Sequence, residues 1–142
     1  MKKIPVVYWS GGGNTEEMAN VIAKEIKNAG GDSKLSRVED ANLEEVKASD
    51  IIVLGCPAMG AEQLEESEFE PFFTELEENL KDKLVLLFGS YGWGGGEYMK
   101  IWEERVITAG GLLATESVLA ENYPEPDVLE RCKEAAKQIV NQ

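Results

Sequence analysis

The residues with the clearest chemical potential form a glycine-rich loop near the start of the chain. The loop follows an apolar run over residues 4–7, precedes a helical pattern, and consists of Ser10, Gly11, Gly12, Gly13, Asn14 and Thr15. Glycines let backbone N–H groups turn inward, hydroxyls add donors, and the positive end of a helix dipole points at the same place. The pattern predicts a phosphate-binding site, with a plain strand-to-helix turn as the alternative.

Two common nucleotide-binding motifs are excluded at this loop. It lacks the lysine of the P-loop pattern, and Glu16 stands where a dinucleotide-binding motif has its third glycine. The chain has no histidine, so the usual general base and the commonest metal ligand are missing. No catalytic or metal site is therefore predicted. Cys56 and Cys132 are interpreted as small buried hydrophobic residues, because their spacing suits neither a zinc site nor a disulfide framework.

Length and charge limit the classes of protein that remain. The 142 residues predict one domain spanning 1–142. The formal net charge of −13 argues against nucleic-acid and anionic-membrane partners. The apolar runs are too short for a membrane span or a signal peptide, and we expect a cytoplasmic protein. Eight glutamates and no Lys or Arg lie between residues 61 and 80. This acidic run predicts a solvated helix face, a docking surface for a basic partner, or both.

Strand-like and helix-like segments alternate along the chain. The expected strands are residues 4–9, 34–38, 51–55, 84–89 and 112–119, the last of them uninterrupted. The expected helices begin near Asn14, which with Glu17 resembles a capping box, and continue at 43–48, 69–80, 97–109 and 128–140. This alternation predicts an α/β three-layer sandwich around a five-stranded parallel sheet of order 2-1-3-4-5. The loops after strands one, three and four then lie side by side.

Two of these loops carry a large apolar side chain between small residues. Met59 lies in the loop over residues 55–62, and Trp93 lies in the loop over residues 89–96. A flat aromatic ligand between a thioether and an indole would explain both, and loop packing is the alternative for each. Trp9 and Tyr91 could equally be core residues, and Trp102 is expected in the core because it lies on a helix stripe.

Three motifs in register give the chain a resemblance to a known family. Y-W-S-G-x-G-N-T, G-C-P-A-M-G-x-E-x-L-E-x-S and F-G-S-Y-G-W-G resemble the short-chain flavodoxins of anaerobic, clostridial-type bacteria, over nearly the whole chain. The resemblance implies a single flavodoxin-like domain and a bound FMN. It also implies a low-potential one-electron carrier rather than an enzyme. The expected partners are redox proteins with basic docking surfaces, such as ferredoxin-linked oxidoreductases, and the expected state is a monomer.

The resemblance also assigns roles to individual residues. The loop 10–15 and Ser90 would hold the phosphate, Met59 and Trp93 would cover the two faces of the flavin, and Glu62 would accept a hydrogen bond from N3. The peptide at Gly60 would flip on reduction to stabilise the semiquinone, which glycine permits without strain. The remaining cofactor-binding residues that the resemblance implies are Pro57, Ala58, Tyr91, Gly92, Gly94 and Asn122.

The chain departs from the family pattern at three positions. Gly12 stands where the phosphate loop usually has Thr, Pro57 supplies no hydroxyl, and Ala61 replaces the Asp or Ser often found there. The loss of one hydroxyl at Gly12 predicts weaker FMN binding, so a chain with weakened flavin affinity is one alternative. A flavodoxin-fold NAD(P)H quinone or flavin reductase is the other. A receiver domain is disfavoured, because Cys56 stands where its phosphoacceptor Asp would be.

Overall fold

A computed structural model of the chain describes residues 2–59, 63–92 and 94–142. Apolar runs covered on both faces form the central strands, and amphipathic stripes form the helices that cover them. The elements in chain order are β1 (Lys3–Tyr8), α1 (Asn14–Asn28), β2 (Asp32–Arg37), the 3₁₀ turn η1 (Val38–Asp40), α2 (Leu43–Lys47), β3 (Ile51–Gly55), α3 (Phe69–Glu77), β4 (Leu84–Tyr91), α4 (Glu97–Thr108), β5 (Leu112–Leu113), β6 (Val118–Glu121) and α5 (Pro126–Val140).

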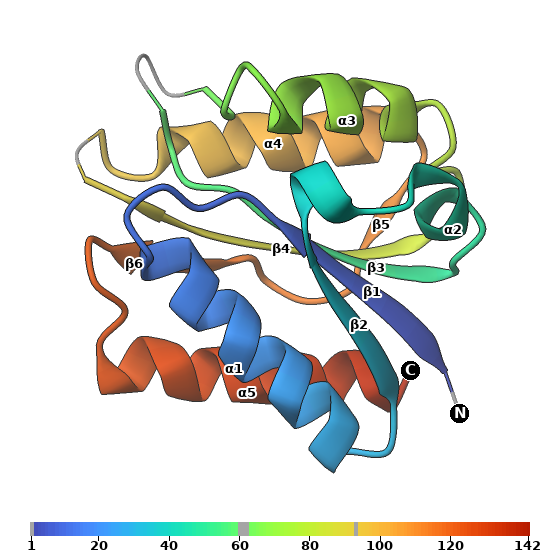
Figure 1. Cartoon of the computed structure of the whole chain (residues 1–142), viewed down its shortest axis with the longest axis horizontal. Helices are drawn as coiled ribbons and strands as arrows, with labels where there is room; N and C mark the ends of the chain where they lie inside the picture. Colours follow the sequence, from blue (N-terminus) through green and yellow to red (C-terminus); the bar gives the residue numbers. More distant parts are fainter. Residues whose placement is uncertain (1, 60–62, 93) are drawn as a thin grey trace.

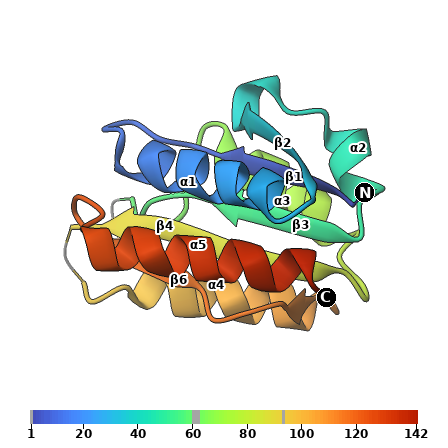
Figure 2. The same cartoon turned by 90° about the horizontal axis from the view of Figure 1, so that it is seen from below.

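The sheet is parallel, and its order β2-β1-β3-β4-β5 confirms the predicted topology. Helices α1 and α5 cover one face, and α2, α3 and α4 cover the other (Figures 1 and 2). Each face has its own apolar cluster. Ile22 and Ile139 lie in the α1–α5 layer, whereas Phe73 and Trp102 lie in the opposite layer. The three-layer sandwich is therefore as expected.

The fifth strand differs from the prediction, because it is interrupted. Both β5 and β6 pair in parallel with β4, and residues 114–117 between them are not strand. Leu84 pairs with Leu112 and Phe88 with Val118, so four steps along β4 correspond to six steps along its partner. Two surplus residues must leave the ladder, and hydropathy does not reveal such a local mismatch.

The start of α1 also differs from the prediction. The residue before the helix is Gly13, in the left-handed conformation with φ of 98°, and no side chain caps the helix. Asn14 is the first helical residue, so the predicted capping box with Glu17 is wrong. A left-handed residue at this position is well suited to glycine. The consequence is that the first two N–H groups of α1, those of Asn14 and Thr15, have no side-chain acceptor among the described residues, whereas the N–H of Glu16 donates to Ser10 Oγ at 3.3 Å.

Candidate phosphate and flavin site

The loops after β1 and β3 are hydrogen-bonded to the carboxyl ends of the neighbouring strands β3 and β4. The N–H of Trp9 donates to Gly55 O at 3.0 Å, and the N–H of Ala58 donates to Ser90 O at 2.9 Å. These bonds place the three loops at one edge of the sheet, as the topology predicts. This edge is called the rim below.

Support for the rim also comes from α4. The Tyr98 hydroxyl donates to the carbonyl of Cys56 at 2.9 Å, from a fully buried position. A Cβ at Gly89 would lie 2.3 Å from the Tyr98 hydroxyl oxygen and 2.2 Å from Cys56 O. Only a residue without a side chain permits this close approach, so Gly89 and Tyr98 together fix the start of the second loop.

A cavity of about 260 Å³ lies between the loops of the rim. Ligand pockets typically enclose ~300–1,000 Å³, so this cavity suits one end of a ligand rather than all of it. Its described lining includes no Lys or Arg, and consists of Trp9, Ser10, Gly11, Gly12, Asn14, Thr15, Pro57, Met59 and Ser90. Eight of the predicted site residues are thus brought together, with Trp9 added.

Backbone donors of the first loop have no partner within the described chain. Among these residues, no acceptor bonds the N–H groups of Gly11, Gly12, Asn14 and Thr15. They lie at the positive end of the α1 dipole and line the cavity. Unpaired donors at a helix N-terminus, with the dipole behind them, constitute an anion-binding arrangement.

Hydroxyl groups complete the donor set. Ser10 Oγ accepts the N–H groups of Gly13 at 3.1 Å and Glu16 at 3.3 Å, which leaves its own proton available. Thr15 Oγ1 and Ser90 Oγ lie 3.2 Å apart, and both residues are buried. The hydroxyls predicted from separate motifs therefore meet at one place. This donor set fits the phosphate of FMN.

Three further predicted site residues, Tyr91, Gly92 and Asn122, lie beside one another outside the described lining of this cavity. The would-be Cβ of Gly92 lies 3.5 Å from Asn122 Oδ1, and the N–H of Asn122 donates to Tyr91 O at 2.8 Å. Asn122 has φ of 60°, a conformation in which Asn is enriched. Met59 and Gln63 exchange two backbone hydrogen bonds, of 2.8 and 3.0 Å. Gly60, Ala61, Glu62 and Trp93 lie outside the described residues.

Sequence reasoning missed Arg37, the last residue of β2. Its guanidinium donates to the carbonyl of Ser10 at 2.8 Å and to Glu39 at 3.0 Å, and lies 3.6 Å from the Glu16 carboxylate. It also lies over the Tyr8 ring, 5.5 Å from the centroid. Burial, and then the hydrogen bond to Glu16, raise the pKa of the Tyr8 hydroxyl. Arg37 was missed because its place beside the loop depends on strand register, in which it pairs with Tyr8.

Glu65 was also missed, since it stands within the acidic run. It is buried, and its carboxylate accepts the N–H groups of Ser67, Glu68 and Phe69 at 2.8–2.9 Å. Desolvation raises the pKa of this carboxyl, but the backbone hydrogen bonds outweigh it and the net pKa is lowered. Glu65 therefore holds the start of α3. No residue-type signal sets it apart from the other glutamates of the acidic run.

Both cysteines are buried, which confirms their interpretation. Burial raises the pKa of the Cys56 thiol far above its usual range, and raises that of Cys132 to about 12. Trp102 is 1% exposed, as expected for a core residue. Among the described residues, no cluster of three or more His, Cys, Asp or Glu could hold a metal ion.

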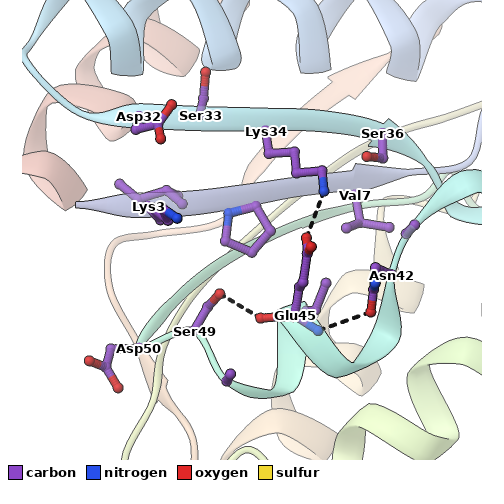
Figure 3. A pocket seen from close by; sticks show the side chains of 15 residues that line it. Lys3, Val7, Asp32, Ser33, Lys34, Ser36, Asn42, Glu45, Ser49 and Asp50 are labelled. Atoms are coloured by element: carbon purple, nitrogen blue, oxygen red, sulfur yellow. Dashed lines mark hydrogen bonds and ion pairs between the residues drawn. The ribbon is translucent and has the colours of Figure 1, made fainter. Parts of the chain in front are cut away.

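A larger cavity, of about 640 Å³, lies away from the rim and contains none of the predicted site residues (Figure 3). Side chains of β1, β2 and α2 line it, and Lys34 Nζ donates to Glu45 Oε2 at 2.6 Å. Because α2 has only five residues, it covers little of the sheet face beside β1 and β2. The cavity follows from this incomplete covering.

A doubly wound parallel sheet with free helix N–H groups at its switch point defines a phosphate-binding α/β domain. A family model described as Flavodoxin matches residues 6–135. The flavodoxin of Megasphaera elsdenii is 50% identical over 131 residues, which cover 92% of this chain and 93% of that protein. The flavodoxin of Clostridium beijerinckii is 48% identical, over 96% of this chain and 98% of that protein.

A solved structure agrees with these sequence matches. The solution structure of two-electron reduced Megasphaera elsdenii flavodoxin superposes with a TM-score of 0.87 and 47% identity, covering 98% of this chain and 99% of that one. The chain belongs to the flavodoxin family and is of the short-chain, clostridial type. Flavodoxins bind FMN and carry electrons between redox proteins, and this chain is accordingly an electron-transfer protein rather than an enzyme.

Proposed function

We propose that the cavity at the rim holds the phosphate of FMN, and that Met59 and Trp93 flank the flavin. Four unpaired backbone N–H groups at the start of α1, at Gly11, Gly12, Asn14 and Thr15, carry this proposal among the described residues. The hydroxyls of Ser10, Thr15 and Ser90 add donors for a dianion. When bound, FMN supplies the one-electron chemistry, and the protein binds and orients it.

The proposed roles of the other residues rest on the family resemblance. Ala58 and Gly92 would meet the flavin edge through their backbones, Glu62 would accept from N3, and Gly60 would allow its peptide to turn on reduction. Asn122 would lie near the flavin ring, which is supported by the hydrogen bond from its N–H to Tyr91 O at the end of β4. Pro57, Tyr91 and Gly94 complete the proposed site. We also propose that the whole chain acts as a single domain and a monomer.

The test is a comparison of FMN with riboflavin, which lacks the phosphate. Titration of the apoprotein, followed by quenching of flavin fluorescence, should give a tighter dissociation constant for FMN. Inorganic phosphate should compete with FMN and leave riboflavin binding unchanged. Equal affinities for the two flavins, or no binding of FMN, would contradict the proposed phosphate site.

The proposed docking surface for basic redox partners is the exposed part of the acidic run. Glu65 is used to start α3, and Glu70 and Glu77 bind Arg105. The exposed carboxylates that remain are those of Glu66, Glu68, Glu75 and Glu78. One-signed surfaces of this kind accelerate encounter with opposite charge. Replacing Glu75 and Glu78 by Gln should slow electron exchange with a basic partner at low salt, and have little effect at high salt.

None of the helices in the described chain is long and apolar enough to cross a membrane. A cytoplasmic location remains our proposal and is checked by fractionation of cells that produce the protein.

A further inference from the structure

Arg37 stands outside the cavity yet contacts the loop that bounds it. It ends β2, on the side of β1 opposite to β3, whereas the loop after β3 contributes Pro57 and Met59 to the cavity and the end of β4 contributes Ser90. Arg37 is not part of the described cavity lining, and its Nη2 donates to Ser10 O at 2.8 Å. The loop therefore lies between Arg37 and the cavity.

The bond to Ser10 O constrains the next peptide group. In a trans peptide the C=O and the following N–H point in opposite directions. A Ser10 carbonyl held toward Arg37 turns the Gly11 N–H toward the other side of the loop, where the cavity lies. Gly11 is one of the four residues whose N–H has no acceptor in the described chain.

Charge compensation acts at the same position. The Glu16 carboxylate, in the first turn of α1, accepts a hydrogen bond from Tyr8 and lies 3.6 Å from Arg37 Nη1. Without a cation beside it, Glu16 would repel a phosphate dianion at the helix start. Glu39, at 3.0 Å from Arg37 Nε, fixes the other edge of the guanidinium. One side chain thus orients a loop peptide and offsets part of the charge of the Glu16 carboxylate.

We propose that Arg37 is a positioning residue for phosphate: it presets the Gly11 N–H toward the cavity and offsets part of the negative charge of Glu16, so that it selects FMN over riboflavin. The proposal rests on the proposed function of the rim. Arg37 affects only the binding of the phosphate, because its contacts are with Tyr8, Ser10, Glu16 and Glu39.

The test measures FMN and riboflavin dissociation constants for the full chain and two variants of equal charge. Arg37→Gln should weaken FMN about tenfold and leave riboflavin within about twofold, since the lost interactions involve charged groups. The control is Arg131→Gln on α5, because the Arg131 side chain is 59% exposed and its guanidinium lies 4.0 Å from the Asp127 carboxylate. It should leave the FMN-to-riboflavin ratio unchanged.

If Arg37→Gln does not fold, Arg37→Lys is the second variant, because it keeps the positive charge. A single ammonium group cannot hold Ser10 O and Glu39 in the geometry of the planar fork, so an intermediate ratio is expected. A ratio equal to that of Arg131→Gln, or an equal loss for both flavins, would overturn the role of Arg37. Failure of the unaltered protein to bind FMN would instead refute the proposed function.

Discussion

Gly12 is the residue at which an added side chain reports most directly on phosphate binding. A Cβ built there meets no described atom within 4 Å, and the residue does not have a positive φ. We expect Gly12→Thr to tighten FMN by roughly 10- to 100-fold, because one added hydroxyl bond to a charged group contributes ~1.5–3 kcal/mol. Fluorescence titration measures this change.

Gly12→Ala is the matched control for the threonine variant, since it adds a methyl group without a hydroxyl. Its affinity for FMN should remain close to that of the unaltered protein. An unchanged or weaker affinity in Gly12→Thr would remove the hydroxyl argument. Neighbouring Gly11 is unsuitable for the same experiment, because a Cβ there would lie 2.9 Å from the Trp9 ring.

Gly60 carries the prediction about the first one-electron potential. The peptide flip proposed for Gly60 would need positive φ, where a side chain costs ~1–2 kcal/mol. Gly60→Ala should therefore lower the first potential by roughly 40–90 mV, at ~59 mV per 1.4 kcal/mol for one electron. A potentiometric titration gives the value, with Gly12→Ala as the control. No change would exclude Gly60 from this role.

Glu65 links a single carboxylate to the stability of the fold. Glu65→Gln should lower the free energy of unfolding by about 1–2 kcal/mol at neutral pH. The reason is that an amide NH₂ group replaces one carboxylate oxygen and cannot accept the hydrogen bond from the Ser67 N–H. Urea unfolding of the apoprotein measures the difference. Glu66→Gln, at an exposed neighbouring position, should have little effect.

The pH dependence of this effect has a defined sign. The pKa of Glu65 is lowered from its ordinary value of 4.5, so its contribution is fully present above about pH 4.5 and is lost as the pH falls through the folded-state pKa. The stability difference between the unaltered protein and Glu65→Gln should therefore shrink on acidification. A difference that stays constant down to pH 3 would contradict the assignment.

At the scale of elements, Arg105 joins α3 to α4. Its guanidinium binds Glu70 at 2.7 and 2.8 Å and Glu77 at 3.0 and 3.1 Å, and lies 4.7 Å from the centroid of the Phe73 ring. We expect Arg105→Lys to lower the free energy of unfolding by about 1–2 kcal/mol, since an ammonium cannot reproduce two bidentate pairs and a stacked contact.

The control for Arg105→Lys is Arg131→Lys, which alters an exposed guanidinium on α5. Urea unfolding should place this control within about 0.5 kcal/mol of the unaltered protein. Equal effects of the two substitutions would mean that the bond network adds nothing to the packing of α3 on α4.

Elements were predictable where one physical preference dominated. Continuous apolar runs located β3, and the four-residue stripe of Met18, Ile22 and Ile26 located α1, so the order of the sheet followed. The cap of α1 was mispredicted because residue types favour Asn14 as the residue before the helix, whereas Gly13 holds that position in the left-handed conformation and Asn14 is already helical. The break before β6 depends on two residues of register, which a pattern of residue types does not encode.

The loops that form the candidate site were predictable from the sequence, but the residues that support these loops were not. Three motifs located the residues that line the cavity, because each motif directly follows a buried strand. Arg37 was not predicted because it approaches the first loop from β2. Glu65 was not predicted because burial distinguishes it from its neighbours only in the folded chain. Interactions between distant segments depend on register and packing, which become visible in three dimensions.

For the molecule as a whole, we expect the net charge to influence the second one-electron potential. The net charge of −13 and a described cavity lining without Lys or Arg disfavour a further negative charge on the cofactor. Raising the salt concentration should therefore raise the second potential through screening. Redox titrations at several salt concentrations test this, and the variant with Glu75→Gln and Glu78→Gln should show a weaker dependence. A salt-independent second potential would contradict the argument.

The interruption between β5 and β6 has a consequence for how the domain tolerates added chain. Each half of the divided strand is hydrogen-bonded to β4 in its own register, so neither depends on the other for its alignment. Extra residues inserted into the segment 114–117 would form a loop outside the sheet, and β5 and β6 would both remain paired with β4. This segment is therefore a position at which the chain can become longer without a change in the strand register of the sheet.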